Sequence, residues 1–304
     1  MKAYLDAYLQ HLKNLNYSPN TIKQRKSMLN NFISYLRERN FSTPEQIRRD
    51  DLEEYLSFKR QSKNKFESQD SPLYQNQTLV CIREFFKFLK KEGYLNIDPS
   101  SDLEFVRVPK RLPNCVLTHQ EFKQIIKEVD PHTSIGYRDR TILEVLYSSA
   151  IRRNELLTLK VKDVDYVEGL ALVNGKGNKE RRVPLGKTAC QYLENYIRTV
   201  RPMLEPKNKP GEYLFLSNAG TRLKETGFKK LIDKYVLQSG IEKAITPHAF
   251  RRGATTGMIK NRANVMLVKD MLGHETLDTI KHYLKLNIED LKAEHKRTHP
   301  REKK

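Results

Sequence analysis

The chain has 304 residues, of which 38% are hydrophobic, and this is enough for about two domains with proper cores. Lysine and arginine number 56 against 37 aspartate and glutamate, so the formal net charge is +19. This excess predicts a polyanionic partner, and double-stranded DNA is the leading candidate because a duplex presents a dense line of phosphates. A membrane surface is the weaker alternative, since the basic residues are spread along the chain instead of forming one tract.

The apolar runs, the N-terminal residues and the cysteines argue against a membrane protein, a secreted protein and a zinc site. No run of 18 apolar residues occurs, so no transmembrane helix is expected, and polar residues within the first dozen argue against a secretory signal. The three cysteines, Cys81, Cys115 and Cys190, are far apart, and no Cys/His spacing suggests zinc. We therefore expect a cytoplasmic protein with reduced thiols and with no metal or other cofactor.

Residues 1–107 are predicted to form a small helical domain. Ser18-Pro19 supplies an N-cap and a proline at the first helical position, and a capping box at 43–46 repeats the start signal. In the stretch 77–95, Gly93 is a plausible helix stop, and apolar residues at helical spacing predict core packing. The stripe consists of Ile82, Phe85, Phe86 and Leu89. For Phe88 a second interpretation is open, as a platform that stacks on bases.

Two prolines, at 109 and 113, mark an extended linker over 108–115, and a larger domain is expected over 116–304. Residues 1–111 hold 20 basic and 14 acidic residues, and the remainder holds 36 and 23, so the net charges are +6 and +13. Both parts could therefore contact the same polyanion. The candidate DNA contacts are Lys23, Arg25, Lys26, Lys110 and Arg111. For the first three, a plain solvated helix face is an equally good interpretation.

The larger domain is predicted to be mainly α, with one small β-hairpin. A capping box at 118–121 starts its first helix, and the stretch 170–185 alternates as a hairpin does, with Gly-Lys-Gly-Asn as its turn. Helices are expected within 121–129, 138–149, 153–159, 187–200, 229–240, 247–259 and 272–286.

Four stretches carry candidate chemistry: SAIRRNELL, NGKGNKERRVP, TPHAFRRG, and LGH followed nine residues after its histidine by a tyrosine. Together they resemble the tyrosine recombinase family, the phage-integrase and Xer group, because the residue types occur in that family's order and spacing. The resemblance covers nearly all of the chain. It implies a two-domain DNA clamp, with a helical SAM-like N-terminal core-binding domain and a tyrosine recombinase catalytic domain. The catalytic set that it implies is Arg152, Lys176, His248, Arg251, His274 and Tyr283.

The implied roles agree with side-chain chemistry. A free tyrosine has a pKa of about 10, so Tyr283 needs a base such as His248 to take its proton as it attacks a phosphodiester. The guanidiniums of Arg152 and Arg251 match phosphate geometry and keep their charge. By resemblance, Lys176 protonates the 5′-hydroxyl leaving group and His274 donates a hydrogen bond to the phosphate. The product is a 3′-phosphotyrosyl enzyme, formed without metal or ATP.

Taken one at a time, these residues can be explained by ordinary structural or surface roles without catalysis. Tyr283 is one of 15 tyrosines, and Lys179 is the local rival of Lys176. His282 is interpreted as a surface residue, and Glu155 is expected to pair structurally near Arg152, outside the catalytic set. The sequence also departs from the family pattern at three positions where the family often has glycine, a small or apolar residue, and histidine: Ala150, Arg153 and Arg252.

The implied function is site-specific DNA recombination, with a homo-tetramer that acts on two DNA sites through a Holliday junction. A monomer free in solution is compatible with this. The segment 287–298, which follows the nucleophile, is hypothesised to dock on a neighbouring protomer. Two alternatives stay open: a type IB topoisomerase, which shares the tyrosine chemistry but exchanges no partners, and a non-enzymatic DNA-binding derivative. Chromosome dimer resolution, phage integration and transposon movement are not distinguished.

Overall fold

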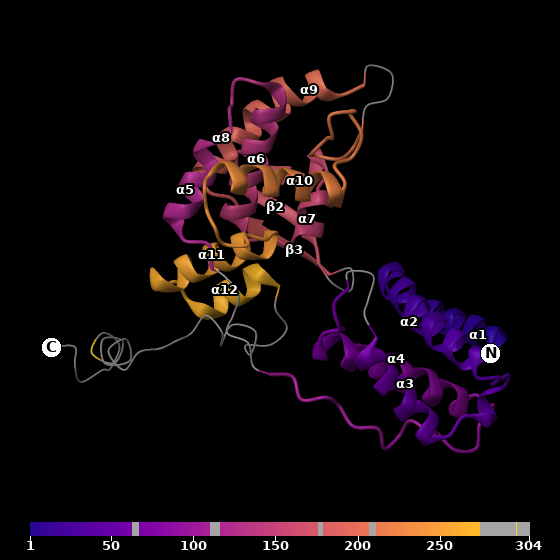
Figure 1. Cartoon of the computed structure of the whole chain (residues 1–304). Coiled ribbons are helices and arrows are strands. Elements are labelled where there is room, and N and C mark those ends of the chain that lie inside the picture. Colours follow the sequence, from indigo (N-terminus) through magenta and orange to yellow (C-terminus); the bar gives the residue numbers. More distant parts are fainter. Residues whose placement is uncertain (63–66, 110–115, 176–178, 207–210, 274–295, 297–304) are drawn as a thin grey trace. The chain divides into compact units, whose positions relative to one another are not determined.

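The computed structural model describes residues 1–62, 67–109, 116–175, 179–206, 211–273 and 296. The chain divides into two compact units, Met1–Lys110 and Arg111–Lys304, shown in Figure 1. Both units are mainly helical, and the second also contains a small sheet. This confirms the predicted fold class of a mainly α chain with a small β element.

The first unit is built from helices whose starts are set locally. The side chains of Ser18 and Ser71 accept hydrogen bonds from the backbone of Thr21 and Tyr74, at 3.2 and 3.3 Å, and a proline follows each serine. Its elements are α1 (Lys2–Asn14), α2 (Pro19–Glu38), the 3-10 turn η1 (Pro44–Gln46), α3 (Arg49–Gln61) and α4 (Pro72–Lys91).

The apolar stripe of α4 forms the core of this unit. Phe85 and Phe86 are fully buried and pack on each other, and Phe86 also packs on Phe32 of α2. Phe88 is also buried, at 7% exposure, so the interpretation of this residue as a base-stacking platform is wrong. Gly93 has φ +78°, as a helix stop in the left-handed conformation requires.

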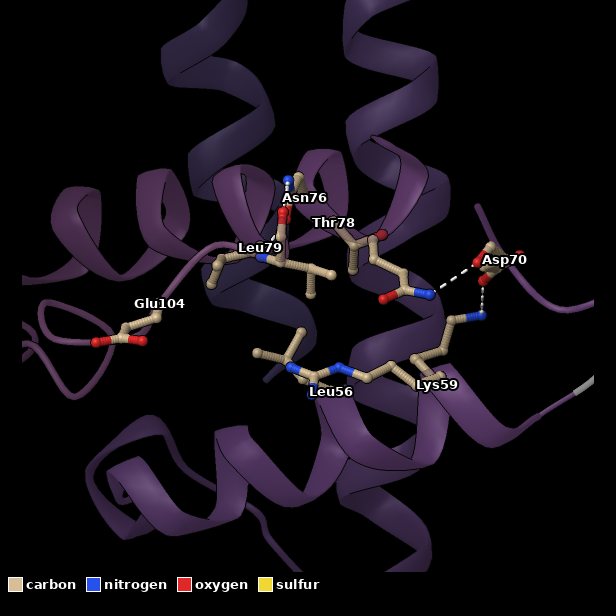
Figure 2. Close-up of a pocket in the computed structure, with 10 residues that line it drawn as sticks. Leu56, Lys59, Asp70, Asn76, Thr78, Leu79 and Glu104 are labelled. Atoms are coloured by element: carbon tan, nitrogen blue, oxygen red, sulfur yellow. Dashed lines mark hydrogen bonds and ion pairs between the residues drawn. The ribbon is translucent and has the colours of Figure 1, made fainter. Parts of the chain in front are cut away.

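The chain that follows α4 is fastened back onto that helix. The Asn76 side chain donates to the carbonyl of Val106 at 2.8 Å and accepts from its N–H at 2.9 Å. Figure 2 shows Asn76 at a pocket with the Lys59–Asp70 ion pair at one side. The pocket has a volume of about 10 Å³, which is room for one water at most, so it is no site for a larger ligand.

The second unit is organised around α6 (Ser134–Ser149), which is buried on most of its circumference. Its buried side chains include charged ones, and Arg138 pairs with Asp139 at 2.6 Å. The helix contacts helices α8 and α11 and strand β3. The other helical elements before the sheet are α5 (His119–Lys127), α7 (Arg153–Thr158) and the 3-10 turn η2 (Val161–Asp163). Those after it are α8 (Lys187–Asn195), the π-helical turn η4 (Tyr196–Val200), α9 (Arg201–Leu204), α10 (Glu225–Gln238), α11 (Pro247–Lys260) and α12 (Val265–Leu272).

The predicted hairpin is confirmed. Strands β2 (Leu170–Asn174) and β3 (Glu180–Pro184) pair antiparallel, and the N–H of Gly175 donates to the carbonyl of Lys179 at 2.9 Å. The two-residue strand β1 (Val164–Asp165) adds to the free edge of β2, which gives the order β1-β2-β3. This third strand was not predicted, because two residues are too few to show an alternation of apolar and polar side chains.

The prediction of a helix over 272–286 is wrong at its start. Leu272 ends α12, and Gly273 follows in the left-handed conformation with φ +63°, which stops a helix. Residues 274–286 lie outside the described part of the chain. Helix α12 itself was not predicted, although Asn264 is a signal for it: its side chain caps the helix by accepting from the N–H of Met266 at 2.9 Å.

Candidate active site

Arg152 stands at the N-cap of α7, just after a sharp turn that ends α6. The turn is made by Ala150, which has φ +50° and is fully buried against Ala254, Val268 and Leu272. A residue with a Cβ costs about 1–2 kcal/mol in this conformation relative to glycine. The departure from the family's glycine is therefore tolerated here, because the extra methyl group of Ala150 is packed in the core.

His248 and Arg251 come from the first turns of α11. Pro247 occupies the first helical position, so the helix starts where the TPHAFRRG stretch predicts. The spacing of three residues places His248 and Arg251 on neighbouring positions of one helix face. Arg251 is only 2% exposed, and it donates to the carbonyls of Ala150 at 2.8 Å and Leu272 at 2.7 Å.

Three arginines converge on the carboxyl end of α12. The carbonyls of Met271, Leu272 and Gly273 accept hydrogen bonds at 2.9, 2.7 and 3.1 Å respectively. Their donors, in the same order, are Arg181 of β3, Arg251 of α11 and Arg152 of α7. These carbonyls carry the negative end of the helix dipole, which favours positive charge. Elements α7, β3, α11 and α12 therefore meet at the residues that precede position 274.

The carboxylate of Glu155 lies beneath this cluster and is 3% exposed. Oε1 accepts from the guanidiniums of Arg152 and Arg181, both at 2.9 Å. Oε2 accepts from the backbone N–H of Arg152 at 2.8 Å and from Arg181 at 2.9 Å. The expected pairing of Glu155 with Arg152 is confirmed. Burial alone would raise the pKa of Glu155, but the hydrogen bonds from Arg181 and Arg152 outweigh it, and the pKa lies below its ordinary value.

The imidazole of His248 is exposed on the surface but stands in a strongly positive environment. Its pKa is lowered from the ordinary value by partial desolvation and by the charges of Arg252, Arg251 and Arg152. The charges of Arg152 and Arg251 therefore both act on the His248 ring. A lowered pKa favours the neutral ring, the form that can accept a proton.

The remaining members of the predicted catalytic set, Lys176, His274 and Tyr283, lie outside the described residues, as do Lys110, Arg111 and, apart from residue 296, the segment 287–298. Among the other candidate DNA contacts, Lys23 and Lys26 are exposed on α2. Arg25 differs from them, because its guanidinium is hydrogen-bonded to the Tyr8 hydroxyl and lies 5.2 Å from the ring centre of Tyr17.

Sequence reasoning missed Arg181 as a residue of the site. Its neighbours Lys179 and Arg182 are also basic, so composition does not single it out. The hairpin gives a partial signal, since Arg181 alternates with the exposed Arg182 and therefore points to the opposite face of the sheet. Its partners Glu155 and Met271 could not be read from the sequence.

Within the residues that the structure describes, no group of three or more His, Cys, Asp or Glu side chains could hold a metal ion. Over the same residues, no helix is both long and apolar enough to cross a membrane.

Comparisons with known proteins agree with this geometry. The model of the "Phage integrase family" matches residues 115–290, and that of the "Phage integrase, N-terminal SAM-like domain" matches residues 5–93. The chain is 34% identical to "Tyrosine recombinase XerC 2" of Ralstonia nicotianae over 304 aligned residues, which cover 98% of this chain and 85% of that protein.

Two solved structures share the fold. The Tn1549 transposon integrase in complex with transposon right end DNA has a TM-score of 0.73 at 18% identity, covering 97% of this chain and 98% of that one. The lambda integrase tetramer bound to a Holliday junction has a TM-score of 0.67 at 16% identity, covering 90% and 77%. With its helical first unit, its arginine cluster and these matches, the chain belongs to the phage integrase family and is a tyrosine recombinase of the Xer type.

Proposed function

We propose that this tyrosine recombinase cuts and rejoins double-stranded DNA at specific sites, with Tyr283 as its nucleophile. The observation that carries the proposal is the convergence of Arg152 and Arg251 on neighbouring carbonyls of α12, directly ahead of His274. Two guanidiniums held side by side match the geometry of a phosphate group, and neither can lose its charge. They would stabilise the negative charge that develops on the phosphate oxygens during attack.

The proton transfers are assigned to two further residues. Tyr283 loses its proton as it attacks, and His248 is the proposed acceptor, because its positive surroundings favour a neutral ring. The leaving 5′-hydroxyl needs a proton, and the proposed donor is Lys176, which lies between β2 and β3 in the sequence. His274 is proposed to donate a hydrogen bond to the same phosphate.

The proposed intermediate is a 3′-phosphotyrosyl bond, which keeps the energy of the phosphodiester that was broken. A 5′-hydroxyl can therefore reverse the step without ATP or a metal ion. If the attacking hydroxyl comes from a second site, strands are exchanged and a Holliday junction forms. The lambda integrase tetramer on such a junction supports an assembly of four copies on two sites. DNA as the substrate supports a cytoplasmic location.

The test begins by finding the site. Duplexes with a randomised segment are selected on the full-length Tyr283→Phe protein, and the selected sequence is placed twice on a supercoiled plasmid. We expect the wild-type protein to delete or invert the segment between the two copies, and the variant to do neither. Relaxation of a plasmid without any site, with no exchange of segments, would support a type IB topoisomerase instead. Binding without either product would support the non-enzymatic alternative.

A further inference from the structure

Arg181 lies outside the proposed catalytic set, yet its guanidinium is fixed by contacts to two other elements. Nε donates to the Met271 carbonyl at 2.9 Å, and both terminal nitrogens donate to the two carboxylate oxygens of Glu155, also at 2.9 Å. The side chain is 15% exposed. Every guanidinium nitrogen is thus used, and β3 is fastened both to α7 and to the end of α12.

The two arginines at Glu155 differ in what they can offer to a phosphate. Arg152 is at the surface, with its side chain 36% exposed, whereas Arg181 faces inward. If Arg152 were the sole partner of Glu155, the two charges would largely cancel, and little attraction for a phosphate would remain. With Arg181 present, the group of Arg152, Glu155 and Arg181 has a net charge of +1. The net charge decides the attraction for a phosphate, because charge–charge interactions are stronger near a buried carboxylate than in water.

We propose that Arg181 is a positioning residue for DNA cleavage. It neutralises Glu155, so that Arg152 keeps its positive charge for the scissile phosphate, and it holds strand β3 against the end of α12. The inference rests on the phosphate-binding role proposed for Arg152. An arginine is needed because its planar guanidinium bonds both carboxylate oxygens of Glu155 and the Met271 carbonyl at once, which the ammonium group of a lysine cannot do.

The experiment compares full-length variants in one single-turnover assay, in which a nicked DNA site traps the covalent complex. Arg181→Met keeps the apolar stem but removes the charge and the donors. We expect this variant to cleave at least about tenfold more slowly than wild type, in the range found for loss of a preorganised charge partner, while its DNA affinity changes by less than about threefold. The matched control is Arg182→Met, which removes the same charge from the exposed neighbour and should cleave within about threefold of wild type.

The double variant Arg181→Met/Glu155→Gln separates positioning from a plain loss of structure. Removing the charge of Glu155 should release Arg152, so the double variant should cleave faster than Arg181→Met alone. A double variant that is equally slow or slower would overturn the proposal, since two structural defects would add. Cleavage by Arg181→Met at the wild-type rate would also overturn it.

A second measurement needs no DNA chemistry. Hydrogen exchange of the DNA-free protein should be faster in Arg181→Met than in Arg182→Met for peptides that cover 265–273 and 152–158. Unchanged exchange in both peptides would overturn the coupling. If the wild-type protein forms no covalent complex, the proposed function fails, and the exchange data still decide whether Arg181 links the three elements.

Discussion

Gly273→Ala adds only one methyl group, but we expect it to disturb the hydrogen bonds of the arginine cluster strongly. Gly273 has φ +63°, a conformation that costs a residue with a Cβ about 1–2 kcal/mol. In addition, an added Cβ would lie 3.0–3.1 Å from Nε, Cδ and Cζ of Arg181. That side chain is held by three hydrogen bonds and cannot move without weakening one, and a bond to a charged group is worth about 1.5 kcal/mol or more. We therefore expect a total loss of about 3 kcal/mol of unfolding free energy.

Gly240→Ala is the matched control, because Gly240 has φ +68° but no atom within 4 Å of an added Cβ. It should lose only the conformational part, about 1–2 kcal/mol. Urea unfolding of the full-length protein measures the difference, with pulse labelling of α6 peptides to report the second unit, since two units need not unfold together. Gly273→Ala should also slow cleavage, whereas Gly240→Ala should not. Equal stability losses in the two variants would refute the contact with Arg181.

Three further predictions concern other residues of the two units. Ala150→Gly removes the cost of a left-handed alanine but also deletes a buried methyl group, and these two contributions to the unfolding free energy offset each other. Thermal unfolding should therefore place the variant within about 1 kcal/mol of wild type. A loss above about 2 kcal/mol would contradict this. Since the pKa of His248 is lowered, its imidazole should titrate below the ordinary value of about 6.5 in an NMR titration without DNA. Cleavage should decline only as the pH falls through that lowered pKa, because the neutral ring is the form that accepts a proton. A pKa above the ordinary value would contradict the positive surroundings assigned to His248. Lys23→Gln and Lys26→Gln should each reduce the slope of log affinity against log salt by about 1, if these exposed residues contact phosphates, and no change in slope would assign them to a plain solvated face.

The features that sequence reasoning predicted correctly are those set by neighbours in the chain. The helix starts at Pro19 and Pro247 follow from a residue and its next few neighbours, because capping is local. The hairpin is equally local, since alternation and a Gly-rich turn suffice to specify it. The burial of Phe85 and Phe86 follows from helical spacing alone.

The features that it missed depend on contacts between distant segments. The three bonds of Arg181 join residues 26 and 90 positions away in the chain, and no local pattern reports such distances. The end of α12 at Leu272 was missed for a different, local reason: the apolar residues after Gly273 continue a helical pattern in the sequence, and this pattern hid the helix stop at the left-handed glycine. The deep burial of Arg251 could not be anticipated either, since a basic residue on a basic chain is ordinarily expected at the surface.

We propose that Tyr283 attacks DNA at a site prepared by Arg152, Arg251 and His248. The measurement that tests it most directly uses a nicked duplex with the selected site, incubated with wild-type protein or with Tyr283→Phe and separated on a denaturing gel. We predict a covalent protein–DNA band for the wild type and none for the variant, with equal occupancy of the site by both. A band that persists with Tyr283→Phe would show that another residue is the nucleophile and would contradict the account.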